Sequence, residues 1–187
     1  MLHLFPHWNW EGKEGQEIEV WVHSNLDRVE LFLNGQSQGA QDVARNTHLM
    51  WKVKYAAGTI EARGFKGGQQ VLTSRRETTG EPAAIVLRPD RPRIDADGKD
   101  VAMVTVEVVD AQGRVIPTAS HEVTFAVTNG KLIGVGNGDP SSHEPDKADK
   151  RHAFNGLCMA IVQSSLTGGG VKVEASSPGL KSASVTV

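Results

Sequence analysis

Apolar and polar residues alternate with a period of two along much of this chain. Ile18, Val20 and Val22 lie on one side of such a segment, and Glu17, Glu19, Trp21 and His23 lie on the other. A period of two is that of a β-strand, whose successive side chains point to opposite faces of a sheet. The first 80 residues contain no amphipathic helix pattern. The pattern therefore predicts an all-β fold.

Five or six short strands fit into the first 80 residues, with turn signals between them. Asn34-Gly35 closes one pair as a hairpin turn, and Lys66-Gly67-Gly68 reverses the chain again. This spacing is typical of a β-sandwich. The strands are predicted at 17–23, 29–33, 49–55, 59–65 and 70–77.

A second series of about seven strands follows a lapse in the apolar pattern at residues 78–82, which suits a short linker. The chain is long enough for two domains of about 100 residues each. We therefore expect one β-sandwich over 1–80 and another over 81–187. Six of the strands of the second are predicted at 83–87, 102–108, 122–127, 157–163, 171–175 and 183–187.

The stretch 134–154 is the least regular part of the chain. Long structureless loops are unusual in compact domains and tend to be functional or packed against another element. This loop concentrates carboxylates and imidazoles that suit calcium, yet their spacing matches neither a calcium loop nor a zinc motif. We interpret it as a polar loop in which Asp139 and Glu144 cap turns, with interdomain docking and metal binding as alternatives. The acidic and histidine residues are Asp139, His143, Glu144, Asp146, Asp149 and His152.

Charge and cysteine content exclude several classes of protein. The formal net charge is −2, which argues against binding to nucleic acid or an anionic membrane surface. No run approaches the roughly 20 apolar residues of a membrane span. The single cysteine, Cys158, rules out an intramolecular disulfide and a multi-thiolate zinc site. Its apolar surroundings predict a buried, unreactive thiol.

Catalytic motifs are missing from the sequence. Glycoside hydrolysis needs two carboxylates held across a sugar, and no two acidic residues are paired in an apolar setting. No Gly-x-Ser-x-Gly nucleophile motif occurs. Gly134, Gly136 and Gly138 are not followed by a helix that would hold a phosphate. We predict no catalytic residue, no metal and no cofactor.

All four tryptophans fall in the first predicted domain. Trp51 shares a strand side with Leu49 and Val53, which predicts a core position, whereas Trp21 lies on the outer side. Trp8 and Trp10 are expected to share a face near the start of the chain. Indole rings stack on sugars or anchor interfaces, so two hypotheses stay open. One is carbohydrate binding; the other is packing, together with His3, Phe5 and His7, against a missing domain.

Two long stretches carry a family resemblance. Residues 3–12, with Phe5-Pro6-His7-Trp8-Asn9-Trp10, and the runs 18–22 and 29–35 resemble the segment after the catalytic barrel of bacterial β-galactosidases of glycoside hydrolase family 2. The run 136–163, with Gly136-Asn137-Gly138-Asp139-Pro140, is similar to the last domain of the same enzymes. The resemblance implies two tandem immunoglobulin-like β-sandwich domains. The family's catalytic glutamates lie on a barrel before this segment, and no position here matches their motifs.

The resemblance predicts a non-catalytic C-terminal fragment of a β-galactosidase-type enzyme. Its partner would be the absent N-terminal catalytic domain of the same polypeptide, and the aromatic-rich opening suggests a chain cut from a longer protein. A carbohydrate-binding module is the first alternative, and an adhesive cell-surface sandwich is a weaker one. The compartment stays open. The residues predicted to bind carbohydrate or dock to another domain are Trp8, Trp10, Trp21, Asp139, His143, Glu144 and Arg151.

Overall fold

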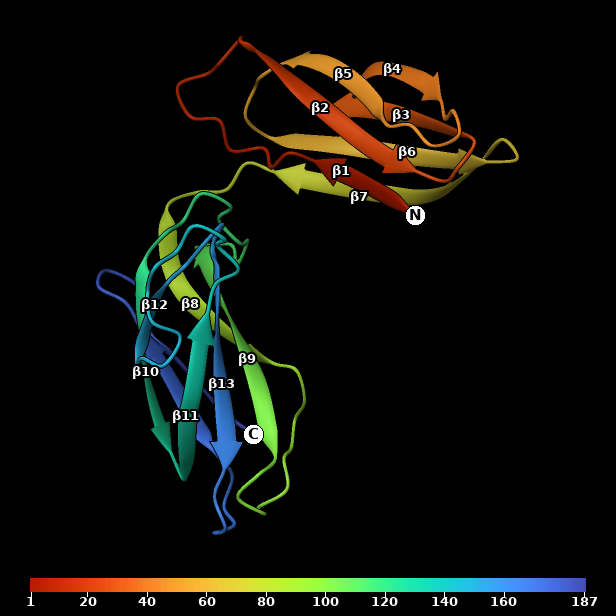
Figure 1. Cartoon of the computed structure of the whole chain (residues 1–187). Coiled ribbons are helices and arrows are strands. Elements are labelled where there is room, and N and C mark those ends of the chain that lie inside the picture. The colour runs from red at the N-terminus through yellow and green to blue at the C-terminus, as the bar shows by residue number, and fades with distance from the viewer. The chain divides into compact units, whose positions relative to one another are not determined.

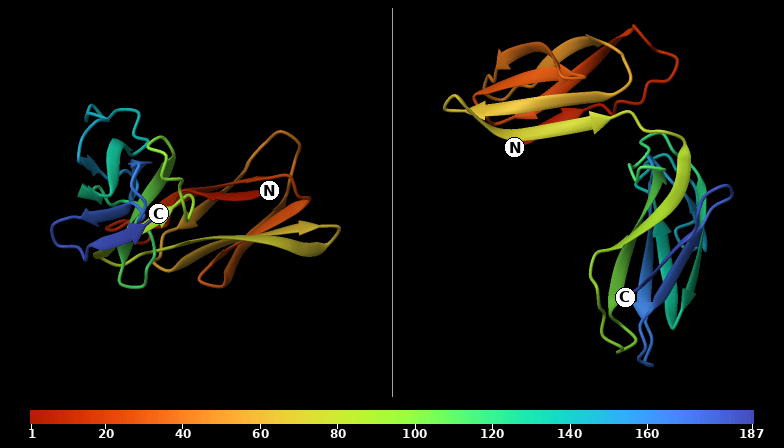
Figure 2. Two further views of the ribbon diagram at one scale, coloured as in Figure 1. Left: turned by 90° about the horizontal axis from the view of Figure 1, so that it is seen from below. Right: turned by 180° about the vertical axis from the view of Figure 1, so that it is seen from behind.

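The computed structural model describes residues 1–187 and consists of strands and loops, without a helix. No helix in it is therefore long and apolar enough to cross a membrane. The chain divides into two compact units, unit 1 (Met1–Thr78) and unit 2 (Thr79–Val187). Each unit consists of two antiparallel sheets, as Figures 1 and 2 show. The predicted all-β class, with tandem immunoglobulin-like sandwiches, is confirmed.

Unit 1 contains a three-stranded sheet and a four-stranded sheet. The first has the order β1-β2-β5 and the second the order β4-β3-β6-β7. Every neighbouring pair is antiparallel. The strands are β1 (Leu2–Phe5), β2 (Glu17–Ser24), β3 (Arg28–Leu33), β4 (Gln36–Asp42), β5 (Leu49–Lys54), β6 (Thr59–Lys66) and β7 (Gln69–Glu77).

The core of unit 1 lies between the inward sides of these two sheets. Val20 and Val22 of β2 are buried against Leu31 of β3 and Ile60 of β6. This burial follows directly from the alternation in the sequence, because every second side chain of a strand faces the other sheet. Trp51 is buried among them, as predicted.

Strand β4 is absent from the sequence prediction. Its residues, Gln36–Asp42, are nearly all polar and show no alternation. The strand forms because Asn34 and Gly35 both adopt positive φ angles, 49° and 81°, which is the geometry of a type I′ hairpin turn. The turn sets the pairing of β4 with β3 at the edge of the sheet. A polar edge strand also discourages pairing with another chain.

Unit 2 contains two four-stranded sheets, with the orders β12-β10-β14-β15 and β11-β13-β9-β8. Their inward sides bury valine and alanine, among them Val104, Val106, Val123 and Ala160. The strands are β8 (Pro82–Pro89), β9 (Val101–Asp110), β10 (Glu122–Thr128), β11 (Gly130–Gly136), β12 (Lys150–His152), β13 (Leu157–Ser164), β14 (Lys172–Ser176) and β15 (Ala183–Thr186).

Two details of unit 2 bear on the sequence predictions. Cys158 is buried, as predicted, and this burial raises the pKa of its thiol to about 12. The irregular stretch is shorter than the predicted 134–154. Gly134 to Gly136 continue β11, and Lys150–His152 form β12, so the long irregular segment is residues 137–149, and residues 153–154 follow β12 outside any strand.

Asp110 closes the turn after β9. Its side chain is fully buried, and it accepts hydrogen bonds from the backbone N–H groups of Gly80, Gln112 and Arg114. The Arg114 guanidinium also pairs with it, at 2.7 Å. Burial alone would raise the pKa of Asp110. The hydrogen bonds and the arginine outweigh that effect and hold the pKa far below its usual range.

We predict that Asp110→Ala destabilises unit 2 by about 3 kcal/mol, because it leaves several buried donors without an acceptor. The stabilisation from Asp110 is present above the unfolded-state pKa, near 3.8. It is lost as the pH falls through the lower folded-state pKa. Urea unfolding of both proteins between pH 7 and pH 3 measures the effect, and the difference between them should shrink towards pH 3. A constant difference across this range would contradict the assignment.

Candidate functional site

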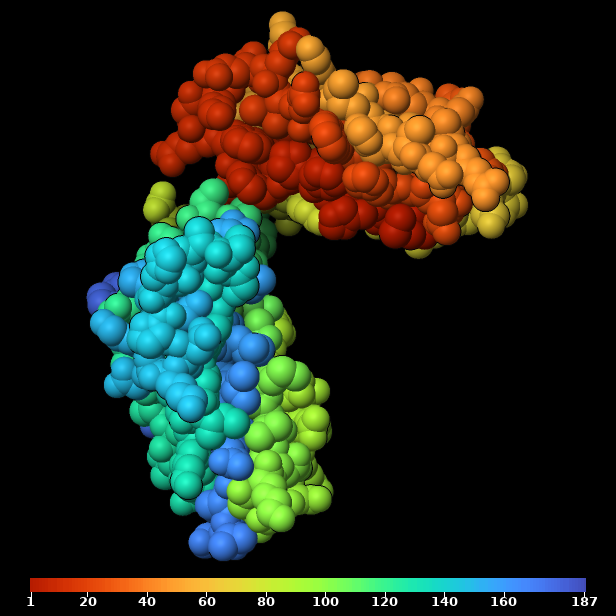
Figure 3. All heavy atoms as spheres, in the orientation of Figure 1, coloured from red at the N-terminus to blue at the C-terminus, as the bar shows by residue number.

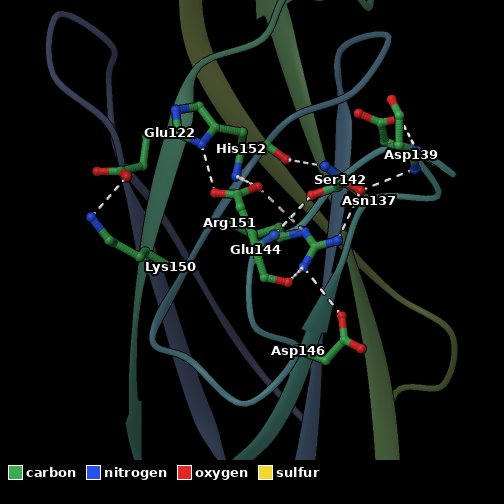
Figure 4. Close-up of polar contacts among 10 residues, drawn as sticks. Glu122, Asn137, Asp139, Ser142, Glu144, Asp146, Lys150, Arg151 and His152 are labelled. Atoms are coloured by element: carbon green, nitrogen blue, oxygen red, sulfur yellow. Dashed lines mark hydrogen bonds and ion pairs between the residues drawn. The ribbon is translucent and has the colours of Figure 1, made fainter.

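Arg151 of β12 organises the irregular segment 137–149. The residue is 5% exposed, although it belongs to a short strand at the edge of its sheet. Its guanidinium donates hydrogen bonds to the Asn137 side chain (3.2 Å), to the Glu144 carbonyl (3.0 Å) and to the Asp146 carboxylate (3.2 Å), as Figure 4 shows. Its Nε lies 3.6 Å from a Glu144 carboxylate oxygen. One buried cation thus contacts the first residue of the segment and two residues in its second half.

Further polar contacts complete the segment. The Asp139 carboxylate accepts hydrogen bonds from the Ser141 N–H (2.9 Å) and hydroxyl (2.7 Å), so Asp139 closes a turn. Glu144 accepts a hydrogen bond from His152 (2.7 Å) rather than capping a turn. His143 is exposed and makes no hydrogen bond. Figure 3 shows this segment, in cyan, as part of the surface of unit 2.

Glu122, Glu144 and His152 bring potential metal ligands within 4.8 Å of one another. Both carboxylates already have cationic partners. Glu122 pairs with Lys150 at 2.8 Å, and Glu144 lies beside the buried Arg151. A metal ion would have to displace or repel these two cations. The donor set is therefore satisfied by ion pairs and does not fit a metal site.

Glu122 and Glu144 are close enough to be compared with the catalytic carboxylate pair of a glycosidase. Retaining glycosidases hold their two carboxyl groups about 5 Å apart, but one of them must be protonated to act as the acid. The hydrogen bond from His152 lowers the pKa of Glu144, and the positive charge of Arg151 lowers it further. Glu144 is therefore ionised at neutral pH and has no proton to give. Glu144 therefore cannot serve as the acid of such a pair, and Glu122 is already engaged by Lys150 at 2.8 Å.

Trp8 does not match its sequence prediction. Its indole is fully buried in the core of unit 1, where it donates a hydrogen bond to the Ala56 carbonyl (3.0 Å) and packs edge-on against Tyr55. Residues 6–16 form no strand, so alternation does not place Trp8 and Trp10 on one face. Because the indole of Trp8 is buried, a sugar cannot stack on it. The predicted role of Trp8 in carbohydrate binding is therefore wrong.

Trp10 and Trp21 are half-buried, and their rings already have partners. Trp10 stacks on His7 at 4.7 Å, and the Lys13 ammonium lies 4.9 Å from the centre of its ring. Trp21 stacks on His48 at 4.2 Å. With Phe5, Trp21 belongs to a cluster of rings on the outer face of the β1-β2-β5 sheet. The cluster comprises His3, Phe5, Trp21, His23 and His48.

An apolar surface on unit 2 escaped the sequence analysis. Strand β13 buries Cys158, Ala160 and Val162 on its inward side, yet its outward side is apolar as well. Met103 of β9 pairs with Ile161 of β13, so the two side chains adjoin. Figures 1 and 3 view unit 2 onto this sheet, with β13 between β11 and β9. We define the apolar outer face as Met103, Ile133, Leu157, Met159 and Ile161.

The sequence did contain a signal for this face. Residues 157–162 are apolar at every position, whereas a strand with one solvated side alternates. Met103 is 44% exposed, and Leu157 and Ile133 are each 39% exposed. Contiguous exposed apolar residues of this kind mark interaction surfaces.

We predict that Arg151→Met costs on the order of 3 kcal/mol of unfolding free energy, because it removes the buried donor of the part-buried hydrogen bonds to Asn137 and the Glu144 carbonyl. It should also speed hydrogen exchange in residues 137–149. Lys150→Met is the matched control, since the Lys150 side chain is 54% exposed and its pair with Glu122 is a surface one. Equal effects of the two substitutions would show that Arg151 does not hold the segment.

Comparisons with known proteins agree with this architecture. Residues 85–186 match the model of the glycoside hydrolase family 2 C-terminal domain 5, and residues 15–72 match a domain of unknown function (DUF4982). A crystal structure of a β-glycosidase from Bacteroides vulgatus superposes with a TM-score of 0.95 at 32% identity. The superposition covers 100% of this chain and 24% of the β-glycosidase chain.

Two curated relatives share this similarity. The β-galactosidase BoGH2A of Bacteroides ovatus is 45% identical over 98% of this chain and 22% of its own length. A β-glucuronidase of Formosa agariphila is 35% identical over 100% of this chain and 19% of its own length. The chain thus spans about a fifth of the length of these relatives. It belongs to the C-terminal domains of glycoside hydrolase family 2, as the resemblance in the sequence implied.

Proposed function

We propose that this chain is the non-catalytic C-terminal part of a family 2 β-glycosidase and that it supports the catalytic domain of the same polypeptide. The observation that carries this proposal is the apolar outer face of the β11-β13-β9-β8 sheet. Contact between such a face and water is unfavourable, and the protein becomes more stable when another domain covers the face. The relatives extend well beyond the part that this chain matches, which supplies an occupant: the remainder of the same protein.

The charges of the chain support a non-catalytic role. Every carboxyl group with a displaced pKa is displaced downward, because hydrogen bonds and neighbouring cations favour the ionised form. A glycosidase acid needs the opposite displacement. The groups are Glu61, Asp97, Asp110, Asp139 and Glu144.

Covering the apolar outer face would contribute appreciable stability. Complete burial of an exposed large apolar side chain contributes about 1.5–3 kcal/mol. Met103, Leu157 and Ile133 are only partly exposed, so each would contribute about 1 kcal/mol when covered. That sum suffices to anchor one domain of a polypeptide on another, since the two domains are already linked.

The activity proposed for the parent protein is the hydrolysis of terminal β-galactosides. The β-galactosidase relative is more similar to this chain than the β-glucuronidase, at 45% against 35% identity. The alternative function, sugar binding by tryptophans, stays a prediction. No structural observation favours it, because Trp8 is buried and the rings of Trp10 and Trp21 already stack on histidines.

We expect the purified 187-residue chain to hydrolyse neither a chromogenic β-galactoside nor a chromogenic β-glucuronide. None of the five carboxyl groups with a displaced pKa has it raised, as a glycosidase acid requires. Glu144→Gln and Glu122→Gln serve as controls and should leave the background rate unchanged. Turnover that disappears in either variant would overturn the non-catalytic assignment, since a contaminating host enzyme would not respond to these substitutions.

We also expect Met103→Lys to act differently in two contexts. In the longer parent protein it places a charge in a covered apolar contact and should cost about 3 kcal/mol. In the isolated chain the position is exposed, so the cost should stay below about 1 kcal/mol. Ser184→Lys, an exposed change in β15, is the matched control. Denaturant unfolding of all variants measures these costs, and equal costs of Met103→Lys in both contexts would show that this face is not covered.

A further inference from the structure

Glu61 occupies an unusual position on unit 1. It lies on β6 between Ile60 and Ala62, which face the core, so its own side chain points outward from the sheet. Outward carboxylates are normally exposed, yet Glu61 is only 6% exposed. Its cross-strand partners, Phe32 on β3 and Arg75 on β7, cover it together with Arg63.

Two arginines bind this carboxylate in the same manner. Arg63 donates its Nε–H to one oxygen of Glu61, at 2.6 Å, and Arg75 donates its Nε–H to the other. The Arg63 guanidinium also lies over the Phe32 ring, 3.9 Å from its centre. The terminal amino groups of both arginines make no hydrogen bond within the chain. Glu61 therefore fixes two guanidinium groups whose outer donors stay unused.

Arg63 and Arg75 line a surface hollow of about 260 Å³. The charged groups in its wall are two guanidinium groups and one carboxylate, which leaves one positive charge uncompensated. Burial raises the pKa of Glu61, but the hydrogen bonds and charges of Arg63 and Arg75 outweigh it, so the pKa is lowered and Glu61 stays ionised. The lining residues are Phe32, Asn34, Gly35, Thr59, Glu61, Arg63 and Arg75.

We propose that this hollow binds a carboxylate group of a ligand through the terminal amino groups of Arg63 and Arg75. Guanidinium groups bind planar carboxylates through paired hydrogen bonds. A single negative charge matches the uncompensated charge of the wall, whereas a doubly charged phosphate would face Glu61 with an excess negative charge. The ring cluster, the apolar outer face and the Arg151 segment take no part in this site, so its test is independent of the docking proposal.

The experiment is a titration of the intact 187-residue chain, followed by NMR through the Nε–H signals of Arg63 and Arg75. The probes are sodium glucuronate, glucose as its uncharged counterpart, acetate and inorganic phosphate, at constant ionic strength. We expect saturable shifts with glucuronate and none with glucose. If acetate binds as tightly as glucuronate, the site recognises the carboxylate alone. If acetate binds more weakly, the sugar ring contributes to binding. Both outcomes support a carboxylate site.

Matched variants make the test specific. Arg75→Gln removes one guanidinium and should weaken glucuronate binding at least about fivefold, since charge-assisted hydrogen bonds are lost. Arg76→Gln changes the net charge equally on the next residue, which does not line the hollow, and should change binding less than twofold. Absent saturation, tighter binding of phosphate than of glucuronate, or equal losses in both variants would each overturn the proposal.

Discussion

A sandwich of about 80 to 110 residues has a small core, so the strands inside each sheet must bury one side. The period-two placement of valine, isoleucine and leucine meets this constraint in both units. Val20 and Val22 in unit 1, and Val104 and Val106 in unit 2, are all almost fully buried. The cluster of Glu61, Arg63 and Arg75 lies on an outward side that this burial leaves free, whereas Arg151 pairs across the sheet with the core residue Val123 and so lies on an inward side.

The fold could be predicted from the sequence because that constraint is local and periodic. The prediction failed where a contact from elsewhere in the chain decides the structure. Strand β4 is polar and depends on a hairpin turn, and β12 lies inside a stretch without any apolar pattern. Trp8 was expected to share a face with Trp10 because they lie two positions apart, but no strand covers residues 6–16, and contacts with Ala56 and Tyr55 hold Trp8 in the core.

The candidate sites were predicted only in part for the same reason. Composition placed Asp139 and Glu144 in one polar loop, but the loop is organised by Arg151, whose burial no local pattern reveals. Glu61, Arg63 and Arg75 occupy neighbouring strands and meet only through the register of β6 with β7. The apolar outer face was visible in the run 157–162, whose unbroken apolar character points to a strand covered on both sides.

The reactivity of Cys158 reports how often the two sheets of unit 2 separate. Cys158 is the single thiol of the chain, and it lies at 2% exposure among the side chains that hold the two sheets together. An alkylating reagent needs the thiolate, which the high pKa of this buried thiol suppresses until the sandwich separates. The rate at which the thiol reacts in native buffer therefore follows the fraction of molecules in which that sandwich has opened.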